Sequence, residues 1–149
     1  MMRLWSIAVF VVLSAIAALH LYWGFGGLWP AQDVRGLIDL VIGDTQAQAM
    51  PSAASTMVVA GLIFAGGVIA LLRTTPLPFL PRLVVLSGCW VLAAVFLGRG
   101  SFTYLVAFGI AEWPYQLAAA FAAMDRTVYA PLCLGLGLSF VALALRGRG

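Results

Sequence analysis

The chain has 149 residues, of which 64% are hydrophobic and only 9% are charged, and its formal net charge is +3. Soluble domains carry roughly 25% charged residues, so this composition excludes a soluble globular protein and indicates an integral membrane protein. The basic excess does not require a nucleic-acid partner, because membrane topology and anionic lipid headgroups account for it.

Four apolar stretches are long enough to cross a hydrocarbon core, which needs about 20 helical residues. We place these spans at about residues 4–23, 55–72, 83–98 and 128–145, the third being the shortest. They lack the alternating pattern of barrel strands. The sequence therefore predicts an all-α polytopic membrane protein, with one domain over residues 1–149 and four transmembrane helices in an antiparallel bundle.

The first span ends in a stretch, residues 20–30, that contains the only histidine and is rich in aromatic residues and glycine. Aromatic side chains with a polar tip favour the membrane interface, and glycines allow close approach of backbone or ligand. Arg3 and the alanines at 15 and 17 also resemble a secretory signal. The apolar run continues past those alanines, which favours an uncleaved membrane anchor.

The connection after the first span, residues 24–54, is too long for a simple turn. Its apolar residues at 34, 37, 38, 41 and 42 repeat with helical spacing, so we expect a short interfacial helix there. Ser52 or Ser55 is expected to cap the second span.

The next connection, residues 73–82, contains three prolines and predicts a tight, stiff turn between antiparallel helices.

The last connection, residues 99–127, has apolar residues at 113, 117, 120, 121 and 124, which predict a second interfacial helix. Pro131 is expected either to start the final helix or to kink it. Small residues four apart, such as Gly135 and Ser139, predict close helix packing.

The charges orient this arrangement, and every cation is an arginine. If all four helices span, five arginines and no acid fall on one side: Arg3, Arg73, Arg82, Arg146 and Arg148. The other three arginines fall with all five acids on the opposite side. The positive-inside rule then places both termini in the cytoplasm, as expected for a protein of a bacterial inner membrane.

No motif supplies a complete catalytic or metal-binding set. One histidine and two separated cysteines cannot form a zinc site, and we expect no metal and no cofactor. His20 is a candidate for ligand binding or proton relay, and the alternative is a structural hydrogen bond that fixes the first connection. Asp125 is expected near a helix start, where capping is the favoured explanation for this residue taken alone.

The topology nevertheless gathers polar and aromatic residues on the outer side. If the helix ends converge, these side chains form a polar vestibule that binds a ligand; otherwise they are separate interfacial anchors and weak ion pairs. Three arginines there favour an anionic group. The candidate ligand-binding residues are His20, Tyr22, Trp23, Trp29, Arg99, Glu112, Asp125, Arg126 and Tyr129.

Three separated motifs resemble a bacterial domain-of-unknown-function family of small four-helix membrane proteins. They are His20-x-Tyr22-Trp23 with Gly26-Gly27-x-Trp29, then Gly100-x-Phe102-x-Tyr104, then Phe121 with Asp125-Arg126 and Tyr129-x-Pro131-Leu132-Cys133-Leu134. The resemblance covers nearly the whole chain. It implies four spans but no activity, and the chain departs from the pattern at Gly100-Ser101, where an acidic residue is expected.

The favoured hypothesis is a non-enzymatic integral membrane protein whose outer-side site binds a lipid or a small amphiphile. One alternative is an accessory subunit of a larger membrane complex, and a homodimer is a further arrangement that small-residue packing would allow. The other alternative is a membrane enzyme that uses His20 with Asp125 or Glu112 as acid and base.

Overall fold

The computed structural model describes residues 1–146, and these residues form helices joined by irregular connections. Four helical stretches within them are long and apolar enough to cross a membrane. The all-α prediction with four spans is confirmed. The elements are α1 (Met2–Gly24), α2 (Val34–Val41), α3 (Ala53–Leu72), α4 (Arg82–Ala107), α5 (Ala119–Met124), the π-helical turn η1 (Asp125–Tyr129) and α6 (Ala130–Arg146).

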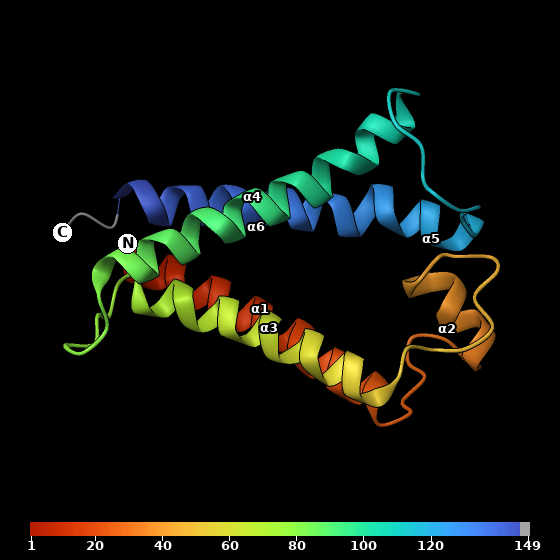
Figure 1. Ribbon diagram of the computed structural model, residues 1–149, viewed down its shortest axis with the longest axis horizontal. Coiled ribbons are helices and arrows are strands. Elements are labelled where there is room, and N and C mark those ends of the chain that lie inside the picture. The colour runs from red at the N-terminus through yellow and green to blue at the C-terminus, as the bar shows by residue number, and fades with distance from the viewer. Residues whose placement is uncertain (147–149) are drawn as a thin grey trace.

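The long helices form two antiparallel pairs, in which α1 packs along α3 and α4 packs along α6. Figure 1 shows that the pairs lie together near the start of α1 and the end of α6 and diverge toward α2 and α5. We call these the terminal end and the α2–α5 end. The buried core joins all four long helices in the half nearest the terminal end, with Val9, Leu13, Ala70, Cys89, Ala93, Leu136, Phe140, Leu143 and Ala144.

The short helix expected in the first connection is present as α2. The Asp33 side chain caps it by accepting a hydrogen bond from the Gly36 backbone N–H at 2.7 Å. Leu37 and Ile38 are buried on its inner face. The Ser52 side chain caps α3 by accepting a hydrogen bond from the Ser55 N–H at 3.2 Å. Ser52 is one of the two caps that the sequence predicts.

Two helices extend beyond the spans expected from the sequence. α4 continues past residue 98 to Ala107, and α5 continues through η1 into α6, so the last helix starts at Ala119 rather than near residue 128. Residues 113–118, which were expected to be helical, are instead irregular. The reason is that Ala118 donates its backbone N–H to the Gly43 carbonyl at 2.7 Å, which replaces a bond within a helix.

The π turn lies directly before Pro131. A proline four residues beyond Thr127 has no N–H to donate to the Thr127 carbonyl, and its ring would crowd that carbonyl in a regular helix. The wider π turn over Asp125–Tyr129 relieves this conflict and keeps α5 and α6 continuous. It also turns the Asp125 side chain into the protein, where it is 1% exposed.

Candidate functional site

The end of α1 folds back on itself through the aromatic stretch noted in the sequence. The Trp23 indole donates to the Trp29 carbonyl at 2.7 Å, and the Tyr22 hydroxyl accepts from the Trp29 N–H at 3.5 Å. Gly27 is required at this turn, because a Cβ atom would lie 2.3 Å from the Tyr22 ring. Tyr22 and Trp29 are exposed, so this stretch is a compact turn on the surface and does not enclose a pocket between these two rings.

His20 lies one helical turn before this surface turn and has a defined tautomer when neutral. Its Nδ1 is 2.9 Å from the Ile16 carbonyl, and because a carbonyl only accepts, Nδ1 carries the proton. The ring also packs at 5.2 Å between centroids against Trp23. Nε2 has no hydrogen-bond partner among residues 1–146 and is the nitrogen left to accept one.

The His20 ring lines a small cavity of about 200 Å³ beneath α2. Its polar lining besides His20 is already bonded locally, since Ser55 and Thr56 both donate their hydroxyls to the Ser52 carbonyl. The imidazole is therefore the polar group there that is free to contact a ligand. The rest of the lining comes from α1, α2, α3 and the connection between the last two, namely Trp23, Val41, Ile42, Met50, Pro51 and Val59.

A second polar group lies between α4 and η1 and joins Arg99, Thr103 and Asp125. Arg99 Nη2 donates to Asp125 Oδ1 at 2.6 Å, and Nη1 donates to Thr103 Oγ1 at 2.9 Å. Thr103 Oγ1 donates in turn to Asp125 Oδ2 at 2.7 Å. Both carboxylate oxygens are thus occupied, and the buried charge of Asp125 is neutralised within the chain.

Aromatic rings cover this ionic group and extend from it. The Arg99 guanidinium lies over the Trp113 ring at 5.5 Å from its centroid, a cation–π arrangement. Trp113 contacts Phe121, Phe121 contacts Tyr129, and the Tyr129 hydroxyl donates to the Leu40 carbonyl of α2 at 3.2 Å. The Arg99 group is therefore connected to α2 through packed rings.

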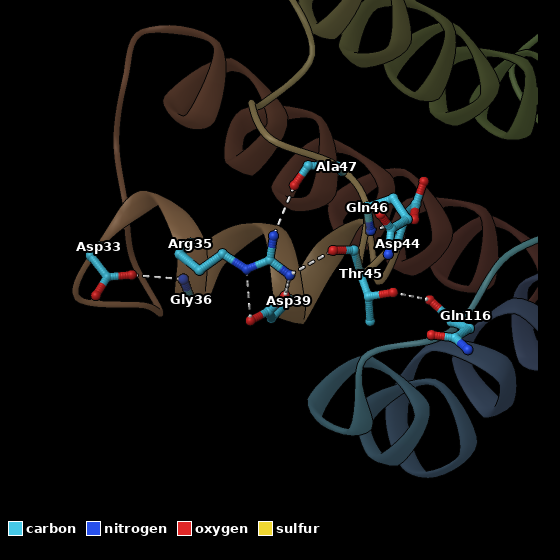
Figure 2. Close-up of polar contacts among 9 residues, drawn as sticks. All are labelled: Asp33, Arg35, Gly36, Asp39, Asp44, Thr45, Gln46, Ala47 and Gln116. Carbon is cyan, nitrogen blue, oxygen red and sulfur yellow. Dashed lines mark hydrogen bonds and ion pairs between the residues drawn. The ribbon is translucent and has the colours of Figure 1, made fainter.

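The two long connections are also joined directly by their backbones. Thr45 donates its backbone N–H to the Gln116 carbonyl at 3.1 Å. Its hydroxyl donates to the same carbonyl at 3.2 Å (Figure 2). Arg35 pairs with Asp39 one turn along α2 and donates to the Ala47 carbonyl at 2.8 Å (Figure 2). These contacts fix α2 and the residues after it as a cover over the α2–α5 end.

The structure divides the residues of the expected vestibule into two groups. His20, Trp23, Tyr22 and Trp29 belong to the end of α1, whereas Arg99, Asp125 and Tyr129 belong to α4, η1 and the aromatic cluster. Glu112 and Arg126 are exposed. Asp125 bonds Arg99 and Thr103 rather than His20, so the two residues do not form an acid–base pair.

Sequence reasoning missed Thr103, Trp113 and the close approach of Gly100 to α6. Thr103 follows Arg99 by four residues, so the two share a helical face. The span expected from the sequence ends at residue 98, and the two residues were therefore not placed together. A Cβ at Gly100 would lie 2.8 Å from Leu134 Cγ and 2.9 Å from the Ala130 carbonyl oxygen. An acidic side chain, expected there from the family resemblance, therefore does not fit between these helices.

A family model described as "Protein of unknown function (DUF3995)" matches residues 13–140. The chain belongs to this family. The match contains all the residues of both groups described above, and it confirms the resemblance to a family of unknown function. No curated protein and no solved structure matches the chain. Within residues 1–146, His, Cys, Asp and Glu side chains form no group of three that could hold a metal ion.

Proposed function

We propose that this member of the family is a non-enzymatic protein of a bacterial inner membrane whose His20 cavity binds a lipid or a small amphiphile. The observation that carries the proposal is the pairing of a fixed imidazole with an apolar cavity. The Ile16 carbonyl accepts a hydrogen bond from the Nδ1–H group at 2.9 Å, which leaves Nε2 to accept a hydrogen bond from a ligand hydroxyl or amide.

The size of the cavity limits what can enter it. Pockets for drug-sized molecules span about 300–1,000 Å³, whereas this one is about 200 Å³. It fits a headgroup fragment or a short apolar segment rather than a whole lipid. A suitable amphiphile places one hydroxyl against His20 inside the cavity. The rest of its length then lies outside the cavity, against the membrane-facing sides of α1 and α3.

The contacts of Asp125 favour binding over acid–base chemistry. General acid–base catalysis needs a second ionisable group within reach of the reacting proton. Both oxygens of Asp125 are instead bonded to Arg99 and Thr103. The described residues that line the His20 cavity include no aspartate or glutamate.

The arginine distribution supports an orientation with both termini in the cytoplasm. Arg3, Arg73, Arg82 and Arg146 all line a single cavity at the terminal end, and Arg148 lies outside the described residues. The His20 cavity lies between the end of α1 and the start of α3, far from the terminal end, so in this orientation it faces the outer leaflet.

A matched pair of adjacent substitutions tests the proposal. Val59 lines the His20 cavity and Val58 does not, yet both are valines on the exposed side of α3. Val59→Phe fills the cavity, so we expect the wild-type protein and Val58→Phe to retain a bound amphiphile after mild detergent extraction and Val59→Phe to lose it. Native mass spectrometry measures the bound mass directly.

His20→Phe adds a test of the polar contact. It keeps an aromatic ring but removes the acceptor, and losing one neutral hydrogen bond is expected to weaken retention about fivefold. A wild-type protein that carries no bound molecule, or a Val59→Phe variant that retains as much as Val58→Phe, would contradict the proposal.

A further inference from the structure

A second cavity lies at the terminal end, away from His20, and its lining is strongly basic. It has a volume of about 550 Å³, and four arginines line it: Arg3, Arg73, Arg82 and Arg146. No aspartate or glutamate is among the described residues that line it. All five acids of the chain lie in or next to the connections at the α2–α5 end. Among the residues that the structure describes, this lining therefore gathers arginine side chains and no carboxylate side chain.

Arg73 is the decisive member of this group because it is buried, with 7% of the residue exposed. Its Nε donates to the Leu143 carbonyl at 3.1 Å, and its Nη2 donates to the Ala144 carbonyl at 3.3 Å. These bonds cap the last turn of α6 and use two of the five guanidinium N–H groups. The remaining donors have no partner among residues 1–146.

A buried charge is normally paired, because removing it from water without a counter-charge is costly. Within the described part of the chain, the side-chain ion pairs are Arg35–Asp39 and Arg99–Asp125, and neither involves Arg73. Backbone carbonyls supply only partial negative charge. Among residues 1–146, Arg73 therefore pairs with no carboxylate and has guanidinium donors left for an anionic group.

We propose that this cavity binds a phosphate group, with Arg73 as its fixed anchor and Arg3 and Arg146 as flanking ligands. Guanidinium groups match phosphate oxygens in shape and charge, and arginines at the cytoplasmic ends of membrane helices commonly contact anionic headgroups. Leu72, Leu77 and Leu80 also line the cavity, so an apolar portion of the ligand is accommodated beside the phosphate. An anionic phospholipid and a free phosphate share this recognition chemistry.

The test uses purified protein in a neutral detergent and three probes: a phosphatidylglycerol, a phosphatidylcholine of the same chain length and inorganic phosphate. Native mass spectrometry gives the Kd of the first bound lipid, and the thermal midpoint of unfolding reports phosphate binding. Arg3→Gln/Arg146→Gln is the main variant, because both residues are exposed and the fold does not depend on their burial. Arg35→Gln, at the α2–α5 end, is the control for a general loss of positive charge.

We expect phosphatidylglycerol to bind more tightly than phosphatidylcholine and the double variant to weaken it about 25-fold, at about fivefold per arginine. Arg35→Gln is expected to leave the Kd unchanged. Stabilisation by inorganic phosphate alone, lost in the double variant, would assign the site to a free phosphate and still support it. Equal binding of both lipids with no phosphate effect, or an equal loss in Arg35→Gln, would overturn the proposal.

Discussion

The two ends of the molecule each place an arginine inside the protein, and they treat its charge in opposite ways. At the α2–α5 end, Arg99 meets the buried carboxylate of Asp125 at 2.6 Å and a ring of Trp113. At the terminal end, Arg73 donates hydrogen bonds to the carbonyls of Leu143 and Ala144, its hydrogen-bond partners within residues 1–146. The first charge is neutralised within the chain, whereas the second pairs with no carboxylate among residues 1–146.

This difference separates a structural ion pair from a binding site. The sequence alone favours the acidic side of the molecule for an anion-binding arginine, since three arginines fall there. Arg99 is instead committed to Asp125 and Thr103. Arg73, at the terminal end, pairs with no carboxylate among residues 1–146, which is why we propose the anion site there.

Asp125→Ala is the strongest way to break the comparison. It leaves the Arg99 charge without its partner, and because the Arg99 side chain is 34% exposed we expect a loss of about 3 kcal/mol in the free energy of unfolding, at the low end for a broken buried pair. Denaturant titration in mixed micelles measures this loss. Asp39→Ala, which breaks the exposed pair with Arg35, is the control and should cost less than about 1 kcal/mol. Equal losses in the two variants would mean that the Asp125 pair is not structural.

Gly100→Ala tests whether the Arg99 pair depends on the close approach of α4 and α6. The new Cβ would lie 2.9 Å from the Ala130 carbonyl oxygen, so the helices must separate, and we expect a loss of about 2 kcal/mol. Gly98→Ala is the matched control on the same helix, because nothing lies within 4 Å of its Cβ position. That variant is expected to be neutral or to gain about 0.5 kcal/mol from helix propensity. A Gly100→Ala protein as stable as Gly98→Ala would contradict the packing seen here.

Arg73→Met is expected to have the smallest effect on stability in the absence of ligand. It removes two hydrogen bonds to the end of α6 but also removes a buried charge, so the expected loss is about 1 kcal/mol. The sharper expectation concerns the ligand: phosphatidylglycerol should raise the thermal midpoint of the wild-type protein and not that of Arg73→Met. A variant still stabilised by the lipid to the wild-type extent would show that Arg73 does not face the anion.

Part of the His20 and Arg99 groups could be anticipated from the sequence. The polar and aromatic residues at the outer ends of the helices were identified, and the presence of Arg99, Glu112 and Asp125 on one side followed from the charge pattern. Their separation into two groups could not be anticipated, because it depends on the divergence of the α1–α3 and α4–α6 pairs (Figure 1). Hydropathy along a span carries no information on that angle.

Glycines illustrate the same limit. Gly135 was expected to pack closely, with Ser139 one turn away, yet nothing lies within 4 Å of its Cβ position. Gly137, two residues later, has its Cβ position 2.6 Å from Leu97 Cγ. Both glycines have the same intrinsic properties, and only the rotation of α6 against α4 distinguishes them.

The sequence by itself determined the four membrane-length helices, the short helix α2 and the segregation of charge between the two ends. These features depend on composition and periodicity over stretches of about 20 residues or fewer, so local physics is sufficient. The tertiary structure decided which arginine finds a carboxylate. Arg99 meets Asp125 across 26 residues and Arg73 meets Leu143 across 70, and contacts at such separations depend on how the helix pairs pack.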